Sequence, residues 1–385
     1  MTTWDVLVVG AGPAGSACSK WLAERGLGVC IVAPPRSGIR AGESLPGAAY
    51  PLLRDLGLLA ALQQSYACPC HGNLSAWGSE DLVCTDFIRD PNGMGWHLER
   101  EGFDLALHQA ALAAGAVHEP FRIETVRRDG GLWQVGLSDG RILSSRFLVE
   151  ASGRSSIIAR RLRVPRHQDT PLVALYAWGQ DRGQDQRSLV ESTSVGWWYS
   201  ASVPGNRRVL GLHVQREFAA HIQRKPQLWA QQLAMTRYMR EWCDANSDWT
   251  ELQAYAAGGA YLERFGGEQW LAIGDAALAM EPLSSQGLFN ALYTGLRGAQ
   301  AIAAYLRGNM VLHADYCSRL QHVRQAYLRH TCLFYAAESR WPDQPFWKER
   351  HTQSLVMLNQ QQDSSMTLNE TMPHKTSQTE VLSTP

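Results

Sequence analysis

The sequence predicts an α/β protein with two interleaved parts, one built on parallel strands and one on a mainly antiparallel β-sheet. An apolar run at residues 6–9 leads into a glycine-marked turn and then a helical stretch, which is the pattern of a buried parallel strand and its crossover helix. A second apolar run, at residues 270–273, ends in Gly274-Asp275 far along the chain. Segments typical of antiparallel strands lie between these runs, so the two parts must interleave.

The N-terminal run ends in a turn of the kind that binds dinucleotides. Gly10, Gly12 and Gly15 lie between the strand and the helix, and Pro13 and Ala14 open that helix. Such a turn needs residues without a Cβ atom, and the helix N-terminus offers free N–H groups and the positive end of a dipole to phosphate groups. We therefore expect these five residues to hold the pyrophosphate of a dinucleotide in a Rossmann-like domain.

The acidic residue expected about 20 residues further on is missing. Residues 28–32 form the second predicted strand, and Ala33-Pro34-Pro35-Arg36 follows it without a carboxylate to bind a ribose hydroxyl. Arg36 is a candidate contact for the adenosine half of the cofactor, and a solvated loop arginine is the alternative. The adenosine half must therefore be held differently, or less tightly, than in a standard site of this kind.

Gly274 and Asp275 predict a second contact to the cofactor. Because they follow a short apolar strand, the carboxylate stands at the C-terminal edge of the sheet, where it can accept a hydrogen bond from a ribityl hydroxyl. Pro282 and Gly287 come next, and helical spacing begins at Leu288. This helix N-terminus would face the N1–C2=O edge of a flavin, where negative charge gathers on reduction. Paired with the N-terminal turn, the segment predicts FAD.

These segments resemble the flavoprotein monooxygenases of the para-hydroxybenzoate hydroxylase type, and two further segments add to the resemblance. Residues 147–160 resemble the family's middle motif, which serves both the flavin and NAD(P)H; they include Gly153, with Ser152 in place of the usual aspartate. Residues 96–105 resemble its arginine-bearing helix start, where Arg100 would approach the cofactor. The resemblance implies a FAD-binding domain of the glutathione reductase type, with NADH or NADPH as reductant.

Two motifs narrow the resemblance to tryptophan halogenases and their relatives, namely Gly-Glu-Ser-Leu-Pro at residues 42–46 and Glu-Pro-Leu-Ser-Ser-Gln-Gly at residues 281–287. Three departures argue against halogenation itself. The chain has no lysine between residues 20 and 225, where halogenases carry one after the first motif, and Ser284 replaces their glutamate. Residues 199–204 also lack both tryptophans of their Trp-x-Trp-x-Ile-Pro strand.

What remains is similar to the flavoproteins that mature tryptophylquinone enzymes, such as lysine or glycine oxidases bearing cysteine tryptophylquinone. This resemblance rests on the same two motifs together with residues 48–53, 72–78, 196–199, 338–341 and 346–347. It implies that the substrate is a partner protein, the precursor of a tryptophylquinone-bearing oxidase or dehydrogenase. Gly42 and Ser44 would then contact the cofactor.

The chemistry implied by these resemblances is hydroxylation of an indole ring. NADH or NADPH would reduce FAD, O₂ would add at the flavin C4a, and the terminal oxygen of the hydroperoxide would pass to an electron-rich indole carbon. Glu43 is the candidate titratable group near the flavin, although its role could equally be to fix its own turn. Ser284, Ser285 and Gln286 are candidate hydrogen-bonding groups beside it. No general acid or base can be assigned from the sequence.

Three other functions stay open. A hydroxylase of small aromatic molecules should consume NAD(P)H faster when given its substrate, with no partner protein present. A flavin-dependent halogenase is disfavoured by the departures above. A flavin-binding maturation chaperone should bind the precursor and keep working after the three glycines of the first turn are replaced by bulky residues.

The order of the motifs predicts the domains. The FAD-binding domain comprises residues 1–66, 97–162 and 258–330, the antiparallel substrate domain residues 67–96 and 163–257, a C-terminal helical segment residues 331–359, and a disordered tail residues 360–385. Strand-like segments at 172–178, 196–203 and 208–214 support the antiparallel domain.

Composition bears on partners and location. The chain has 385 residues, 45% hydrophobic and 19% charged, with a formal net charge of zero, so nothing favours nucleic acid or an anionic membrane as partner. No apolar stretch is long enough to span a membrane and no secretion signal is visible, so we expect a cytoplasmic protein. The eight cysteines lack finger-like spacing, so we expect no metal site. We expect a monomer or weak dimer.

Overall fold

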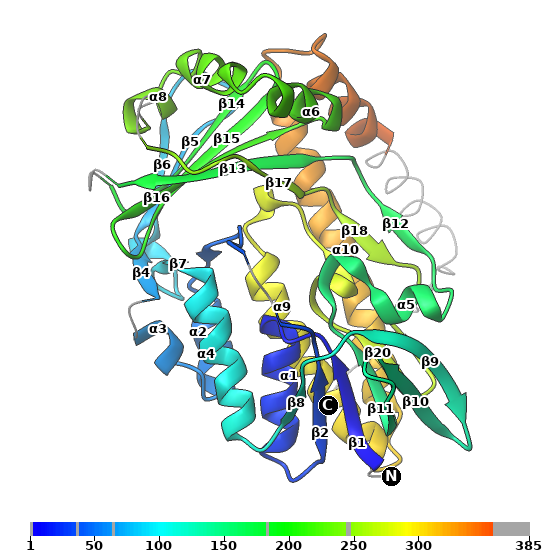
Figure 1. Ribbon diagram of the computed structural model, residues 1–385. Coiled ribbons are helices and arrows are strands. Elements are labelled where there is room, and N and C mark those ends of the chain that lie inside the picture. Colours follow the sequence, from blue (N-terminus) through cyan, green and yellow to red (C-terminus); the bar gives the residue numbers. More distant parts are fainter. Residues whose placement is uncertain (1–2, 36–37, 64–65, 182–184, 244–247, 357–385) are drawn as a thin grey trace, which may run out of the picture.

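The computed structural model describes residues 3–35, 38–63, 66–181, 185–243 and 248–356. Its lower part in Figure 1 is built on an eight-stranded sheet. The strands are β1 (Thr3–Val9), β2 (Val29–Val32), β8 (Val117–Glu119), β9 (Ile123–Asp129), β10 (Leu132–Leu137), β11 (Ile142–Glu150), β19 (Gly266–Gly267) and β20 (Trp270–Ala272). The strands β8, β2, β1, β11 and β20 lie side by side in this order and pair in parallel. β19 pairs antiparallel with β20, and β10 pairs antiparallel with both β11 and β9.

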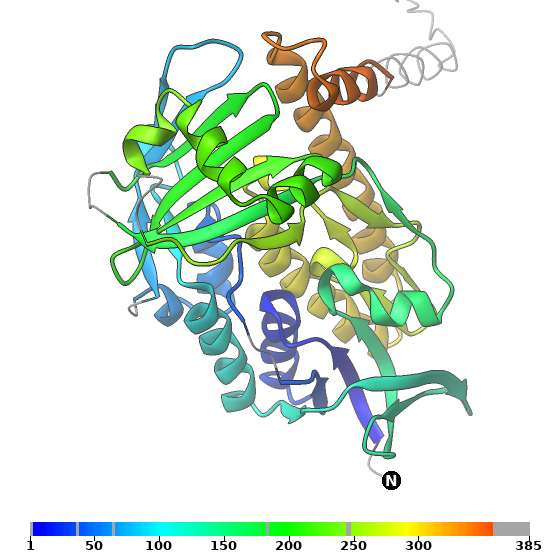
Figure 2. The ribbon, with the colours of Figure 1, turned by 45° about the horizontal axis from the view of Figure 1, so that its top comes forward.

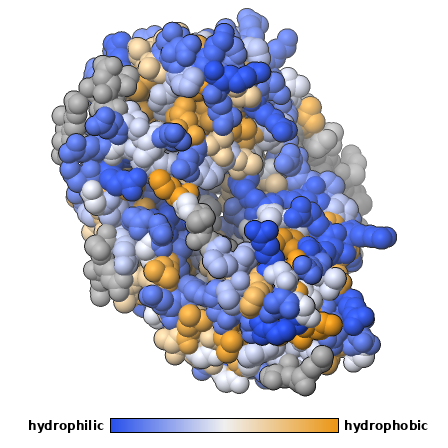
Figure 3. Space-filling model, viewed as in Figure 1, coloured by the Kyte–Doolittle hydropathy of each residue, from blue (hydrophilic) through white to orange (hydrophobic). Residues whose placement is uncertain are grey.

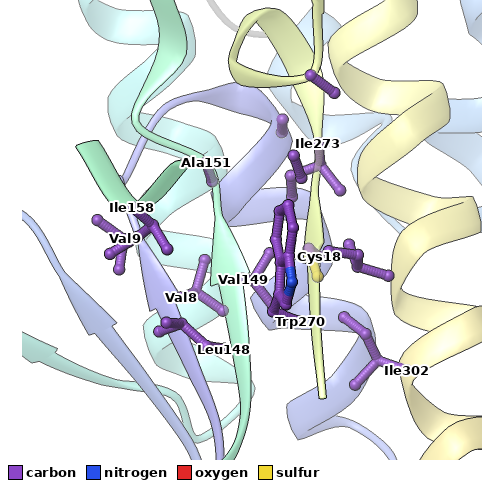
Figure 4. Close-up of a cluster of buried hydrophobic side chains, with 14 of the residues drawn as sticks. Val8, Val9, Cys18, Leu148, Val149, Ala151, Ile158, Trp270, Ile273 and Ile302 are labelled. Carbon is purple, nitrogen blue, oxygen red and sulfur yellow. The ribbon is translucent and has the colours of Figure 1, made fainter. Parts of the chain in front are cut away.

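Apolar strands and helix faces build the core of this part. β1 and β11 are buried over most of their length because both faces of a parallel sheet are covered. The helices α1 (Pro13–Ala23), α4 (Arg100–Ala113) and α9 (Gly287–Leu306) lie beside the sheet, with α1 packed against both others. Figure 4 shows Val8 and Val149 of the sheet and Ile302 of α9 in one cluster of buried side chains.

The upper part in Figure 1 is a seven-stranded, mainly antiparallel sheet. From edge to edge its strands are β17 (Gln253–Ala256), β13 (Val173–Gln180), β16 (Arg207–Val214), β15 (Gly196–Val203), β14 (Ser188–Thr193), β5 (Gly72–Ala76) and β6 (Val83–Asp86). The β14–β5 pair is parallel, and the other neighbouring pairs are antiparallel. Three short helices, α6 (Arg216–Arg224), α7 (Gln227–Ala234) and α8 (Met239–Trp242), cover its outer face (Figures 1 and 2).

Two three-stranded sheets and several short helices complete the fold. β3 (Ser44–Leu45) and β4 (Ala67–Cys70) pair with β7 (Gly95–Leu98), and β12 (Arg166–Gln168) and β21 (Leu278–Ala279) pair with β18 (Ala260–Leu262). The short helices are α2 (Ala49–Asp55), α3 (Ala60–Gln63), α5 (Ile157–Arg161), η1 (Phe87–Arg89), η2 (Gly153–Ser155), η3 (Gly274–Ala276) and η4 (Pro282–Ser284). Because β4 and β7 contact β15, the first small sheet lies where the two parts meet.

The C-terminal region ties the two parts together. The long helix α10 (Val311–Ala337) packs on α9 below and reaches the upper part (Figure 1), where the Trp77 indole N–H donates a hydrogen bond of 2.7 Å to the Phe334 carbonyl. Residues 345–356 are helical as well. The predicted tail, residues 360–385, lies outside the described residues.

The predicted fold class is confirmed, because a sheet of mainly parallel strands with helices is interleaved with a mainly antiparallel sheet and followed by helices. The exact domain boundaries stay a prediction. Among the helices of the described residues, none combines the length and the apolar character needed to cross a membrane. Figure 3 shows a largely hydrophilic face with a hollow between the upper and lower parts.

Candidate functional site

The glycine turn after β1 has no room for side chains. A Cβ atom on Gly10 would lie 2.2 Å from the Ala151 carbonyl oxygen, and Gly10 has a φ of 118°, which favours glycine. A Cβ atom on Gly15 would lie 2.0 Å from the Gly10 carbonyl oxygen. Helix α1 then begins at Pro13 with Gly12 as N-cap, without a capping side chain or an acidic residue in its first turn. Its N-terminal N–H groups are therefore available to an anion.

A cavity of about 400 Å³ brings most of the predicted site residues together between the two parts of the molecule. The predicted residues that line it are Gly12, Pro13, Ala14, Gly42, Glu43, Ser44, Arg100, Gly153, Gly274, Asp275, Pro282, Ser285, Gly287 and Leu288. They come from chain segments far apart in sequence, so the fold gathers them as the motif order predicted.

Four of the predicted residues that the structure describes do not line this cavity. Gly10 and Gly15 lie beneath the turn, where they permit the close packing described above. Ser284 instead donates its hydroxyl to the Glu281 carbonyl at 2.8 Å, and the Gln286 N–H donates to the Ser284 hydroxyl at 3.3 Å, which shapes the turn before α9. Arg36 lies outside the described residues.

Glu43 is a buried carboxyl group in the cavity wall. It is 2% exposed, its Oε2 accepts the Gly42 N–H at 2.7 Å, and its Oε1 has no hydrogen-bond partner within the described part of the chain. Burial raises the pKa of Glu43 to about 7, although backbone hydrogen bonds and the Arg100 charge act in the opposite direction. This carboxyl group can therefore gain or lose a proton near neutral pH.

Arg100 holds the chain segment that carries Glu43. Its Nη1 donates to the carbonyl oxygens of Ala41 and Gly42 at 2.9 and 2.8 Å, and its Nε pairs with Asp104 one helical turn later at 3.2 Å. Arg40 pairs with the same carboxylate. The start of α4 thus fixes the Gly-Glu-Ser turn through charge-assisted hydrogen bonds.

Asp275 lies at the C-terminal edge of β20, as predicted, in the helix η3. Gly274 has a φ of 58°, and its N–H donates to the Thr294 hydroxyl of α9 at 2.8 Å. Arg154 connects this edge to its neighbours, because it lies 3.5 Å from the Asp275 carboxylate and donates to the Gly258 and Met280 carbonyl oxygens. The carboxylate is therefore held at the cavity with its charge partly compensated.

The N-terminus of α9 also opens onto the cavity. The helix begins at Gly287, where an added Cβ atom would meet nothing within 4 Å, and its N-cap Gln286 makes no capping side-chain hydrogen bond. Its first turn holds no acidic residue. The positive end of this helix dipole therefore faces the cavity.

An aromatic wall from the upper sheet closes the other side of the cavity. Tyr176 of β13, Trp197 and Tyr199 of β15, and Tyr255 of β17 all line it. The Tyr176 hydroxyl lies 3.1 Å from His213 Nε2, which keeps that phenol in place. Sequence reasoning did not single these side chains out as site residues, because alternating aromatics on a strand predict only that one face is buried.

Glu281 is another cavity residue that sequence reasoning passed over. It is 3% exposed, and burial raises its pKa, whereas the positive charge of Arg350 acts against that rise. The sequence did carry a signal for this residue, because Glu281 is an acidic residue placed directly after the apolar run 276–280.

A second cavity of about 410 Å³ lies on the other side of the glycine turn. It is lined by Gly10, by the chain after β2 and by three arginines, Arg122, Arg160 and Arg161. Ser152, which stands in place of the middle motif's aspartate, also lines it. Guanidinium groups can bind phosphate and stack on a flat ring. These arginines are therefore candidates to hold the adenosine half of a dinucleotide in place of the missing carboxylate. Arg160 belongs to the recognised motif at residues 147–160, whereas no pattern in the sequence links Arg122 or Arg161 to the turn.

The residues around the two cavities fit FAD. The turn between them needs glycine at Gly10 and Gly15, because a Cβ atom at either position would clash with neighbouring backbone, and the N–H groups at the start of α1 carry no side-chain cap. A carboxylate that can accept from a ribityl hydroxyl, Asp275, and a free helix N-terminus lie along the first cavity. Within the described ranges, no group of three or more His, Cys, Asp or Glu side chains could hold a metal ion.

Fold and site together define a flavoprotein with a dinucleotide-binding part and a covering antiparallel sheet. The chain belongs to the FAD-binding domain family, whose model matches residues 3–331. It is thus a member of an FAD-dependent oxidoreductase family.

Individual relatives span nearly the whole chain. The chain is 27% identical to the putative FAD-dependent oxidoreductase LodB of Marinomonas mediterranea over 372 residues, which is 92% of this chain and 99% of LodB. Other curated relatives, 24 to 26% identical, are flavin-dependent halogenases of Armillaria mellea and a tryptophan 2-halogenase of Chondromyces crocatus.

Flavoproteins of the same two kinds occur among the similar solved structures. The peptidyl tryptophan dihydroxylase QhpG, essential for tryptophylquinone cofactor biogenesis, matches with a TM-score of 0.72 and 27% identity, covering 91% of this chain and 79% of QhpG. The flavin-dependent halogenase CmlS matches with a TM-score of 0.83 and 22% identity, covering 94% of this chain and 70% of CmlS, which establishes a shared fold.

Proposed function

We propose that this chain is an FAD-dependent monooxygenase that hydroxylates a tryptophan side chain in a partner protein, the precursor of a tryptophylquinone enzyme. The observation that carries the proposal is the single cavity that joins the predicted flavin-binding residues to an aromatic wall. The likeness to QhpG over 91% of the chain supports a peptidyl tryptophan as the substrate. NADH or NADPH and O₂ complete the proposed reaction.

The chain's own residues would bind and orient the cofactor. The N-terminus of α1 would hold the pyrophosphate, and Asp275 would accept a hydrogen bond from a ribityl hydroxyl. The N-terminus of α9 would stabilise negative charge at the N1–C2=O edge of the ring. Bound FAD would supply the redox chemistry, namely acceptance of hydride and activation of O₂.

The cavity walls would exclude water and position the indole. Tyr199 offers a ring against which an indole can pack, and Trp197, stacked on His213 with ring centroids 3.6 Å apart, backs the same wall. Glu43 would hold a proton near neutral pH in reach of the cavity, since its pKa of about 7 leaves both of its protonation states populated there. Ser285 lines the cavity and is the member of the predicted Ser-Ser-Gln group that stays a candidate for contact with the ligands.

Hydroxylation of a small aromatic molecule is the second candidate. The aromatic wall of the cavity suits it, because a free aromatic ring can pack against Tyr176 and Tyr199 without a partner protein. This enzyme would consume NAD(P)H faster on addition of its substrate alone, whereas the proposed enzyme would need a partner protein.

Halogenation and a chaperone role are less well supported. The curated halogenase relatives keep halogenation in view, but the chain has no lysine between residues 20 and 225 to handle hypohalous acid. A chaperone would not need the flavin cradle at all.

Co-expression of a quinoenzyme precursor tests the proposal. The intact mass of the precursor would be measured with the wild-type chain, with a variant in which Gly10, Gly12 and Gly15 carry bulky side chains, and without the chain. We expect a mass gain on one tryptophan with the wild type alone. A gain that persists in the FAD-free glycine variant would contradict the proposal in favour of an FAD-independent role.

A further inference from the structure

Four tryptophans form a file of rings that leads from the cavity to the surface. Trp197 lines the cavity, and its ring centroid lies 6.4 Å from that of Trp77. Trp77 lies 5.5 Å from Trp347, which in turn lies 5.9 Å from Trp341. Trp197 and Trp347 are 1% and 0% exposed, whereas Trp77 and Trp341 are only partly buried. The file therefore starts at the proposed flavin site and ends in contact with water.

These rings come from separate segments of the chain, namely β15, the residue after β5, the C-terminal helix and the loop before it. Phe346 and Tyr335 pack in the same hydrophobic cluster, so the cluster contains other aromatic side chains besides the indoles. Indole is the most easily oxidised aromatic side chain that keeps its proton, because a phenol must lose its own when it is oxidised. Burial raises the pKa of Tyr335 and so disfavours that loss.

We propose that the four tryptophans are a pathway for positive charge between the flavin site and the surface. When FAD in the cavity takes one electron, as it does after absorbing blue light, Trp197 loses that electron and becomes a radical cation. Trp77 and then Trp347 each pass one electron inward, so the positive charge moves outward to Trp341. A thiol in solution finally returns one electron and one proton to Trp341.

The hydrogen bonds of the indole N–H groups support this direction. The three inner N–H groups all donate to oxygens of the protein, Trp197 to the Tyr335 hydroxyl at 3.3 Å, Trp77 to the Phe334 carbonyl at 2.7 Å and Trp347 to the Thr193 carbonyl at 2.8 Å. These rings keep their protons and pass the charge on. At the outer end Trp341 is partly exposed to water, and the Arg340 guanidinium, which pairs with the Glu338 carboxylate, lies 4.3 Å from its ring centroid. Trp341 therefore ends the path as a neutral radical, after its N–H proton has passed to water.

Such a pathway would protect the aromatic wall of the cavity. An FAD site that activates O₂ beside Trp197 and Tyr176 puts oxidisable side chains next to an oxidant. Moving an oxidising equivalent to the surface lets a soluble reductant repair it before the wall is modified. The pathway itself needs only bound FAD, whereas its protective role rests on the proposed activation of O₂.

Transient absorption after a blue-light flash on the FAD-bound protein tests the pathway. In the wild type we expect a tryptophan radical that forms with one-electron reduction of the flavin and decays slowly. Trp77→Phe should shorten the lifetime of the separated charges by about tenfold or more, because the positive charge then stays on Trp197 near the electron that attracts it. Trp341→Phe should remove the long-lived neutral radical.

Trp198→Phe is the matched control. Trp198 is the neighbour of Trp197 on β15, equally buried, and its ring packs against Trp229 at 4.6 Å on the other face of the sheet. This variant should keep the wild-type lifetime. FAD content, read from the absorbance spectrum, shows whether each variant folds. If Trp77→Phe does not fold, Trp341→Phe still tests the pathway, because Trp341 is partly exposed. Equal lifetimes in wild type, Trp77→Phe and Trp341→Phe, or no tryptophan radical in the wild type, would overturn the pathway.

Discussion

The hydroxyl oxygens of Ser44 and Tyr199 lie 2.7 Å apart, although 155 positions separate the two residues in the chain. Ser44 belongs to the segment held by Arg100 in the lower part, and Tyr199 to the aromatic wall of the upper sheet. This hydrogen bond connects the two walls of the cavity directly. It therefore couples the position of the Gly-Glu-Ser turn to that of the aromatic wall.

The first prediction concerns this contact. Tyr199→Phe should weaken FAD binding by about 1 kcal/mol, or about fivefold in the dissociation constant, because one hydrogen bond that orders the cavity is lost. Titration of the FAD-free protein with FAD, followed by fluorescence, measures the change. Tyr238→Phe removes a comparable hydrogen bond, to the Glu80 carbonyl at 2.9 Å, away from the cavity and should leave the FAD affinity unchanged. Equal affinities in all three proteins would show that the contact has no part in cofactor binding.

The second prediction concerns the glycine turn. Gly10→Ala should destabilise the protein by several kcal/mol and abolish FAD binding, because the new methyl group would lie 2.2 Å from a backbone oxygen. Gly26→Ala is the control for backbone strain alone, since Gly26 has a φ of 77° but nothing within 4 Å of the added atom. It should cost about 1 kcal/mol and leave FAD bound. Chemical denaturation and FAD titration measure both effects, and similar losses in the two variants would contradict the steric explanation.

The third prediction concerns the pH dependence of stability. The pKa of Glu43 rises from 4.5 to about 7 on folding because the carboxyl group is buried. Between these values the unfolded chain ionises while the folded chain stays protonated, so this group's contribution to stability is full below pH 4.5 and is lost as pH rises through 7. Over this range the FAD-free wild type should lose about 3 kcal/mol of unfolding free energy relative to Glu43→Gln.

Denaturant titrations at several pH values check this sign. Glu268→Gln, at a side chain that is 72% exposed, should show the same pH dependence as the wild type. A difference between wild type and Glu43→Gln that stays constant from pH 4.5 to 8 would mean that Glu43 keeps an ordinary pKa in the folded protein.

The fourth prediction separates hydroxylation from halogenation. With bromide in place of chloride in the assay, the mass of the product should not change, because the chain lacks a lysine between residues 20 and 225. High-resolution mass spectrometry of the product detects bromine by its isotope pattern. A brominated product would assign the chain to the halogenases.

Much of the candidate cofactor site could be predicted because the physical requirements of such a site are local. A turn without Cβ atoms followed by an uncapped helix leaves a readable pattern at Gly10, Gly12 and Gly15, and an acidic residue at a strand end does so at Asp275. Strand periodicity likewise predicted the antiparallel sheet, whose β15 spans the expected residues 196–203.

The rest depends on contacts that no spacing records. The second cavity draws Arg122 and Arg160 from separate segments, and only Arg160 lay in a recognised motif, so the grouping of the two could not be predicted. Glu281 lay inside a recognised motif, but only the fold shows that its carboxyl group is buried at the cavity. Ser284 carries a hydroxyl that could have faced a ligand, but this hydroxyl donates a local hydrogen bond to the Glu281 carbonyl.

The most direct test of the central claim is mass spectrometry of a quinoenzyme precursor co-expressed with this chain under ¹⁸O₂. The proposal predicts an ¹⁸O-labelled mass gain on one tryptophan of the precursor, present only when the chain is present with FAD bound. Absence of any labelled tryptophan in candidate precursors, with FAD intact, would contradict it and leave a small-molecule hydroxylase as the better account.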